Sequence, residues 1–309
     1  MVSLEGRASQ SGAHMRGSLR RLVALPIPGE IDTRLMSSRQ GRPTGPTPRC
    51  IFCDGASGSP MSGEHLWSDW MSSFIPKGAH DSHIETWDTF NVMTQVAPTD
   101  LKHRHGHTTT RKLRRVCRSC NNGWMGDLEQ LAKPHLSQMM SGQSTYMDAD
   151  AQKNVVNWIT LKGMVFENNR REDAATTLEQ RQRFMTDREI PAYTQIHLFR
   201  CGETPWDWQF HRHSASFIAS PTPVPLHPRT KNAQSFVLGV GELLFYVLQA
   251  FAADIEFRFE RVAARQVWPP VDAIVMWPPV MRATRDEAEH LAANMEEFIR
   301  ENSPSWRPG

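Results

Sequence analysis

Hydrophobic and polar positions divide the chain into an aperiodic N-terminal stretch, an irregular middle and a C-terminal half of regular elements. Residues 1–48 are rich in Ser, Gly, Arg and Pro and show neither helical nor strand periodicity, so we expect little fixed structure there. From residue 149 the pattern becomes regular. A broad apolar face predicts a helix over residues 149–167, and the burial of this face requires a partner surface.

Apolar runs in the second half of the chain predict four strands, over residues 194–201, 207–219, 235–240 and 243–250. The last two runs meet near Gly241 and therefore predict a hairpin. A final helix is expected over residues 285–302. Residues 142–309 thus form a predicted α+β domain, and no motif in it points to a chemistry.

Residues 49–141 form a second predicted domain around two closely spaced cysteine pairs, Cys50-x-x-Cys53 and Cys117-x-x-Cys120. Two such pairs complete the tetrahedral thiolate shell of a structural Zn²⁺, which leaves no open position for substrate. Disulfides or free thiols are the alternative. The apolar run at residues 22–25 is too short for a secretory leader, which favours a cytoplasmic location and metal-bound thiolates.

The surroundings of the cysteine pairs extend this interpretation. A turn is predicted at residues 50–55, and a helix is predicted to start near Cys120, with Pro134 kinking or ending it. The fifth cysteine, Cys201, lies in an alternating segment and is expected to pack in the core. Four tryptophans are expected to wrap the small zinc core, with base stacking as the alternative: Trp67, Trp70, Trp87 and Trp124.

Composition sets limits on the partners. The 309 residues are 39% hydrophobic and 22% charged, with a net charge of +2, which is ordinary for a soluble protein. The longest apolar stretch, residues 236–253, is interrupted by glycines and polar residues, so no membrane span is expected.

Basic residues concentrate near the second cysteine pair, because residues 101–126 contain no acidic side chain. Such a cluster suits contacts with nucleic-acid phosphates, and a solvated basic loop is the alternative. An alternating trio of His103, His105 and His107 lies in the same segment and leaves open metal binding or a solvated role. The candidate phosphate-binding residues are Lys102, Arg104, Arg111, Lys112, Arg114, Arg115 and Arg118.

Hydrolysis of a phosphodiester needs a base to take the proton of the attacking water and a cation to neutralise the gathering charge. Glu64 and His65 follow the first cysteine pair and can divide these roles, since histidine is the natural base near neutral pH. Adjacent side chains on a strand point to opposite faces, so twist or a loop must bring both residues to one site.

The segments around Cys50, Glu64-His65 and the run from Val116 to Met125 resemble the HNH (His-Me finger) endonuclease family. The resemblance implies a ββα unit that holds one catalytic divalent metal such as Mg²⁺, acts on DNA in a bacterial or phage setting, and carries a separate structural zinc. It gives His65 the role of general base and makes Glu64 and Asn121 ligands of the catalytic metal, with Asn122 as the close alternative for Asn121.

One position departs from the family pattern. The middle Asn, which orients the base, has no counterpart, and Lys112 or Arg114 is the nearest residue. This departure favours an alternative function, a catalytically inactive zinc-binding module that binds nucleic acid. Asn-Asn-Gly at residues 121–123 could equally form a turn. The C-terminal domain could select the target or form a homodimer.

Overall fold

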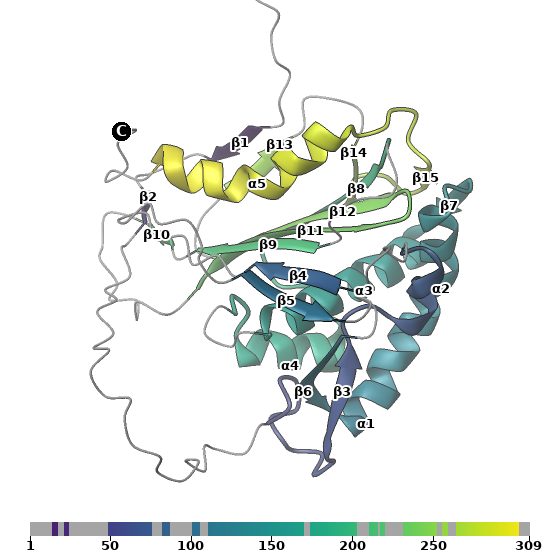
Figure 1. Ribbon diagram of the computed structural model, residues 1–309, viewed down its shortest axis with the longest axis vertical. Helices are drawn as coiled ribbons and strands as arrows, with labels where there is room; N and C mark the ends of the chain where they lie inside the picture. The colour runs from purple at the N-terminus through teal and green to yellow at the C-terminus, as the bar shows by residue number, and fades with distance from the viewer. Residues whose placement is uncertain are drawn as a thin grey trace, which may run out of the picture.

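The computed structural model describes residues 14–17, 22–24, 49–75, 82–86, 101–105, 111–169, 174–202, 210–215, 217–219, 231–251, 255–258 and 264–302 (Figure 1). It is a mixed α+β structure with antiparallel sheets. Its largest sheet has five strands in the order β14-β8-β12-β11-β9. These strands are β8 (Thr194–Arg200), β9 (Phe210–Ala215), β11 (Ala233–Val240), β12 (Leu243–Ala250) and β14 (Ala264–Trp268).

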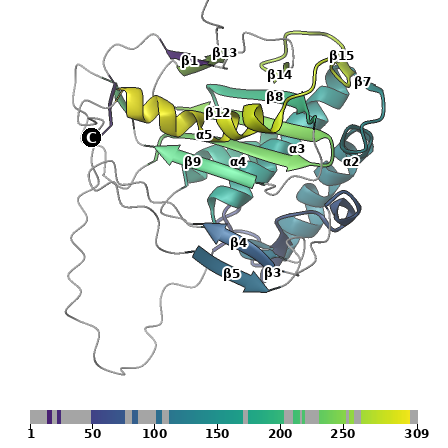
Figure 2. The same cartoon turned by 45° about the horizontal axis from the view of Figure 1, so that its top comes forward.

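Helices cover both faces of the five-stranded sheet, as Figures 1 and 2 show. Helix α5 (Arg285–Asn302) lies on one face, where Leu291 and Met295 pack against Val237 and Leu244 of the sheet. Helix α3 (Ala149–Glu167) lies on the other face. This two-sided cover explains why every residue of β11 and β12 is buried.

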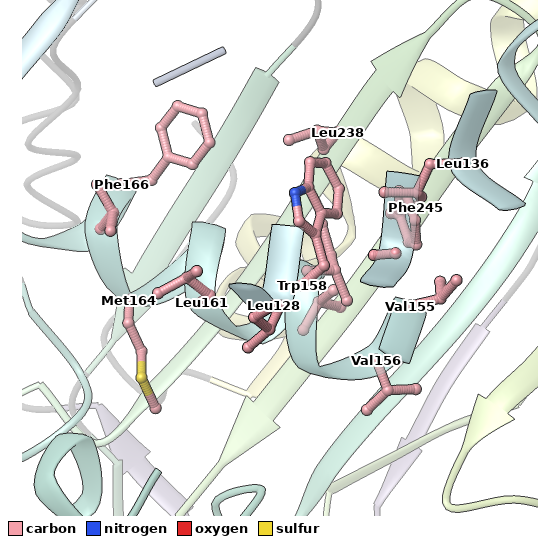
Figure 3. Packing of buried hydrophobic residues seen from close by; sticks show 14 of the residues in the cluster. Leu128, Leu136, Val155, Val156, Trp158, Leu161, Met164, Phe166, Leu238 and Phe245 are labelled. Carbon is pink, nitrogen blue, oxygen red and sulfur yellow. The ribbon is translucent and has the colours of Figure 1, made fainter. Parts of the chain in front are cut away.

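Helix α3 approaches the sheet closely. Figure 3 shows its Trp158 beside Leu238 and Phe245, and the Trp158 and Phe245 ring centroids are 5.9 Å apart. At Gly163 an added Cβ would lie 2.7 Å from the Phe236 ring, so a larger residue would push the helix away. The small residue therefore permits the close packing of this layer.

The region of the cysteine pairs is built on two antiparallel strands followed by a helical segment. Strand β3 (Met61–His65) pairs with β6 (Lys112–Cys117), with a bulge between Ser62 and Glu64. Three helical pieces follow β6 without a break: α1 (Arg118–Cys120), the π-helical turn η3 (Asn121–Met125), which is kinked at Gly123, and α2 (Gly126–Met140).

Shorter elements complete the described structure. Four two-stranded ladders join β1 (His14–Gly17) to β13 (Ile255–Arg258), β2 (Leu22–Ala24) to β10 (Phe217–Ala219), β4 (Ser82–Thr86) to β5 (Leu101–His105), and β7 (Thr145–Met147) to β15 (Val275–Trp277). A 3-10 helix, η1 (Asp69–Ser73), follows β3, and α4 (Leu178–Asp187) follows α3. Apart from β1 and β2, residues 1–48 lie outside the described residues.

Most local predictions for the second half are confirmed. Helices over 149–167 and 285–302, the strands and the hairpin at Gly241 are observed, with the 207–219 run divided into β9 and β10. Pro134 was predicted to kink or end its helix, and it does not end it, because α2 continues to Met140. Pro134 is exposed, so the carbonyl of Gln130, four residues earlier, can be hydrated instead of hydrogen-bonded within the helix.

The buried core is continuous across the predicted boundary at residue 141. One cluster of buried side chains runs from Cys50 and Phe52 through Leu136 to Trp158 and Phe245. The division into two domains stays a prediction, and the cysteine region and α3 share one hydrophobic interior. Among the helices of the described ranges, none has the length and apolar content to cross a membrane.

Gly241 gives a test of the hairpin between β11 and β12. Its φ is +57°, and an added Cβ would collide with the carbonyl oxygen of Met140 at the end of α2. Because both strain and collision arise, we expect Gly241→Ala to lower the free energy of unfolding by about 2–4 kcal/mol. Gly58 has φ +62° but nothing within 4 Å, so Gly58→Ala should cost only about 1 kcal/mol. Equal losses in denaturant titrations would contradict the close approach.

Candidate zinc centre and nuclease site

The first cysteine pair lies in a tight turn. The backbone amide of Asp54 donates to the carbonyl of Cys50 at 3.0 Å, and that of Ala56 donates to Cys53 at 2.8 Å. Positive φ angles at Asp54 and Gly55 let the chain reverse directly after Cys53. The predicted turn is confirmed, and it points both thiols toward the second pair.

The second pair spans the junction of β6 and α1. Cys117 is the N-cap of α1, and its sulfur accepts the backbone N–H of Cys120 at 3.5 Å. The hydroxyl of Ser57 lies 3.2 Å from the same sulfur. A hydrogen bond from Ile51 N to Arg115 O, 2.9 Å long, ties the first turn to β6. Both pairs are thereby held in one place by backbone structure.

All four thiols meet in a buried cluster. The sulfur atoms of Cys50, Cys53, Cys117 and Cys120 lie within 4.8 Å of one another, and those of Cys53 and Cys117 are 3.7 Å apart. A tetrahedral Zn²⁺ with bonds of about 2.3 Å separates its sulfur ligands by about 3.8 Å. No disulfide joins any of the cysteines in this structure, and the geometry of the four sulfur atoms is consistent with a zinc site.

Electrostatics of the cluster also favour a cation. A hydrogen bond from the Cys120 thiol lowers the pKa of Cys50 to about 4, and the same interaction raises the pKa of Cys120. The direction of the Cys50 pKa shift favours a thiolate at this position. A divalent cation replaces thiol protons when it binds thiolates.

Aromatic side chains pack around the cluster. Phe52 is fully buried and meets the Trp124 ring edge-on at 5.0 Å, and the guanidinium of Arg188 covers Trp124 at 4.5 Å. Trp67 packs against Phe166 of α3. These contacts agree with the predicted packing role of Trp67 and Trp124, whereas Trp87 lies outside the described residues. The cluster is therefore joined to the main core.

His65 ends β3, and its ring is partly exposed, with 22% of the side chain accessible. Its Nδ1 lies 2.6 Å from Oδ1 of Asp69, one turn further along the chain. This close polar contact is not aligned as a hydrogen bond. The base assigned by the family resemblance therefore has a carboxylate beside one ring nitrogen.

Glu64 has a different environment from the one expected of a metal ligand. It is buried, and its Oε1 accepts a hydrogen bond from Nζ of Lys162 on α3 at 2.9 Å. The same Nζ donates to the backbone carbonyl of His65 at 3.4 Å. Lys162 therefore already neutralises the charge of the Glu64 carboxylate. The metal-ligand role of Glu64 stays a prediction.

Glu129 completes this buried network. Its Oε2 lies 3.6 Å from Lys162 Nζ and accepts from the Ser68 hydroxyl at 2.6 Å, while its Oε1 accepts from the Trp70 indole at 3.0 Å. Carboxylates from β3 and α2 thus share one ammonium group from α3. The network holds the segment on both sides of His65 against two helices.

Asn121 and Asn122 differ in their surroundings. The Asn121 side chain is half-buried, and its amide donates to the Ser62 hydroxyl on β3 at 3.1 Å. Asn122 is exposed. The helical geometry of residues 118–125, kinked at Gly123, replaces the simple turn that was the alternative for Asn-Asn-Gly. A hydrogen bond thus connects Asn121 to β3, the strand that carries His65.

The candidate phosphate-binding residues separate into three groups. Lys112, Arg114 and Arg118 are exposed along β6 and α1. Arg111 and Arg115 are half-buried; burial lowers the pKa of Arg111, and Arg115 donates to the carbonyl of Asn169 at 3.0 Å. Lys102, Arg104, His103 and His105 belong to β5, whose side chains are not described, and His107 lies outside the described residues.

A second metal centre is not preformed in the described part of the chain. Within it, the four cysteines are the single group of three or more His, Cys, Asp or Glu that could hold an ion. Glu64, the carboxylate that the family resemblance assigns to the catalytic metal, is paired with Lys162 instead. These residues fit a structural zinc and do not form a ready site for a catalytic cation.

Sequence reasoning missed Lys162 and Asp69. A signal for Lys162 was present, since it is a single charge inside the apolar run of residues 155–166. Such a residue is buried only when it has a partner. Asp69 follows His65 by four residues, but contact between them depends on the turn between β3 and η1.

Comparisons with known proteins leave the site to be judged by its own geometry. No protein-family model, no curated protein and no solved structure matches the chain.

Proposed function

We propose that the chain is a metal-dependent endonuclease of the HNH type that hydrolyses DNA with His65 as general base. The observation that carries the proposal is the hydrogen bond from the Asn121 side-chain amide to the Ser62 hydroxyl, which is 3.1 Å long. It ties the start of the helical segment to β3, the strand that ends in His65, while β6 leads directly into that segment. This order of strand, strand and helix beside a four-cysteine cluster supports the family resemblance.

In the proposed reaction, His65 takes a proton from a water molecule, whose oxygen forms a bond to phosphorus. The bond from phosphorus to the leaving oxygen breaks, and that oxygen takes a proton from solvent. A divalent cation, when bound, would neutralise charge on the phosphate. Since the described residues do not form a ready site for this cation, we assign no step to it.

Exposed cations support DNA as the substrate. Lys112, Arg114 and Arg118 lie on β6 and α1, the elements that frame His65 and Asn121. Contacts with phosphates release counterions, so binding should weaken steeply as salt concentration rises. The proposal therefore includes salt-dependent binding of duplex DNA in addition to cleavage.

A specific observation favours a second candidate function, a zinc-stabilised module that binds nucleic acid without cutting it. The carboxylate of Glu64 is buried and paired with Lys162, which leaves it unavailable to a metal ion in this geometry. Such a module would keep the basic surface and the zinc cluster. The two candidates differ in one property, turnover.

Cleavage of supercoiled plasmid tests the proposal. With Mg²⁺ or Mn²⁺ the wild-type protein should nick or linearise the plasmid, and His65→Ala should reduce the rate by at least about 100-fold, because loss of a general base removes that much. His290→Ala, on α5 at the other face of the sheet, is the matched control and should cut normally.

Zinc content is measured in each sample, so that a loss of rate is not caused by a loss of the structural ion. Equal cleavage by wild-type protein and His65→Ala would overturn the role of His65. Salt-dependent DNA binding without cleavage, in protein that holds one equivalent of zinc, would establish the binding module instead.

A further inference from the structure

The Nδ1 atom of His65 is buried and has no aligned hydrogen-bond partner among the residues with described side chains. Buried ring nitrogens of this kind normally have a partner. The charged atom beside it is Oδ1 of Asp69, 2.6 Å away. The Asp69 side chain is 83% exposed, and the contact is within hydrogen-bonding distance.

The backbone around Asp69 is held firmly on both sides. Before it, Leu66 N donates to Arg111 O at 3.1 Å, and the Ser68 hydroxyl donates to Glu129. After it, the Trp70 indole donates to Glu129 at 3.0 Å. Asp69 begins η1 between these anchors, so its carboxylate is kept next to the His65 ring although the side chain itself faces solvent.

Lys112 and Arg114, the residues nearest to the position of the middle Asn in the family pattern, cannot accept a hydrogen bond from the His65 ring. Lys112 lies opposite His65 in the register of β3 and β6, and Arg114 follows two residues later. Both side chains only donate hydrogen bonds, whereas an imidazole Nδ1–H requires an acceptor. Asp69 supplies an acceptor oxygen 2.6 Å from Nδ1, two residues after the buried Trp67.

We propose that Asp69 is the positioning residue of His65. It accepts the Nδ1–H proton and thereby keeps Nε2 unprotonated and directed away from Asp69, where it can take a proton from water. This inference rests on the proposed nuclease function. An exposed carboxylate contributes little to stability, so its removal should leave the fold and the zinc cluster intact.

Cleavage kinetics on a duplex oligonucleotide with Mg²⁺ test the inference. We expect Asp69→Ala to reduce kcat by about 10- to 100-fold, the usual effect of losing such a partner, with KM nearly unchanged. Asp69→Asn keeps an acceptor oxygen and should recover most of the rate. Asp150→Ala, an exposed acid at the start of α3, is the matched control and should behave as wild type.

A second readout reports on the ring itself. Nitrogen NMR of the histidines, with the His65 signal identified from His65→Ala, should show the Nδ1-protonated tautomer in wild type and a loss of that preference in Asp69→Ala. Normal kcat in Asp69→Ala or an unchanged tautomer would each overturn the inference while the nuclease function stands. A wild-type protein that never cleaves would overturn both.

Discussion

Cys120→Ser should lose the bound zinc and melt at a temperature at least about 10 °C below wild type. Zinc binding to such clusters is worth on the order of 10 kcal/mol. If packing of the cysteine region against α3 offsets half of that, the remainder still shifts the melting temperature by this amount, at roughly 2 °C per kcal/mol. Zinc by mass spectrometry and thermal unfolding by circular dichroism measure the two effects.

Cys201→Ser is the control for this experiment. Cys201 is fully buried directly after β8 and belongs to the buried cluster beneath α5, which contains none of the four thiols. Its replacement should keep one equivalent of zinc and cost only the burial of a hydroxyl, about 1–3 kcal/mol. A Cys120→Ser protein that retained zinc and the wild-type melting temperature would show that the cluster is not a zinc centre.

Local pattern was enough to predict the elements that are regular along the chain. The helix over 149–167 and the hairpin at Gly241 each depend on the spacing of neighbouring side chains or on one glycine with positive φ. The spacing of the cysteines likewise predicted their cluster, because two short turns can each direct a pair of thiols to one point. Such features need no knowledge of distant segments.

Features that depend on distant segments were not accessible in this way. The tolerance of Pro134 follows from its exposure, which is fixed only when α2 packs on α3. The buried state of Glu64 follows from Lys162, 98 residues later. Sequence patterns give apolar faces but do not tell which charges will meet between them. The sequence therefore named His65, Glu64 and Asn121 as candidates but did not indicate that Lys162 and Asp69 would lie beside them, and the catalytic roles stay predictions.

Lys162→Met should lower the free energy of unfolding by about 3–5 kcal/mol, because it leaves the carboxylate of Glu64 buried without its cation. Lys162 is 1% exposed, and it lies 2.9 Å from Glu64 and 3.6 Å from Glu129. Lys153→Met, at an exposed position of the same helix, is the matched control and should change stability by less than about 0.5 kcal/mol. Denaturant titrations measure both.

The pH dependence of this contribution follows from the same charges. Burial by itself would lower the pKa of Lys162, but the charges of Glu64 and Glu129 outweigh burial, and the net direction is upward from 10.5. A lysine whose pKa is raised on folding stabilises the protein fully below its unfolded value and loses this effect as pH rises through the folded value. The difference between wild type and Lys162→Met should therefore persist from neutral pH to about pH 10 and shrink only beyond it.

A double mutant separates charge from packing. If the loss in Lys162→Met comes from the unpaired carboxylate, the pair Lys162→Met with Glu64→Gln should regain a large part of the stability, since a neutral amide is less costly to bury than a carboxylate. The two substitutions must then show strong coupling rather than additive effects. Lys162 also donates to the backbone carbonyl of His65, a contact that the double mutant does not restore. Additive losses of stability would instead mean that Lys162 stabilises the core by packing alone.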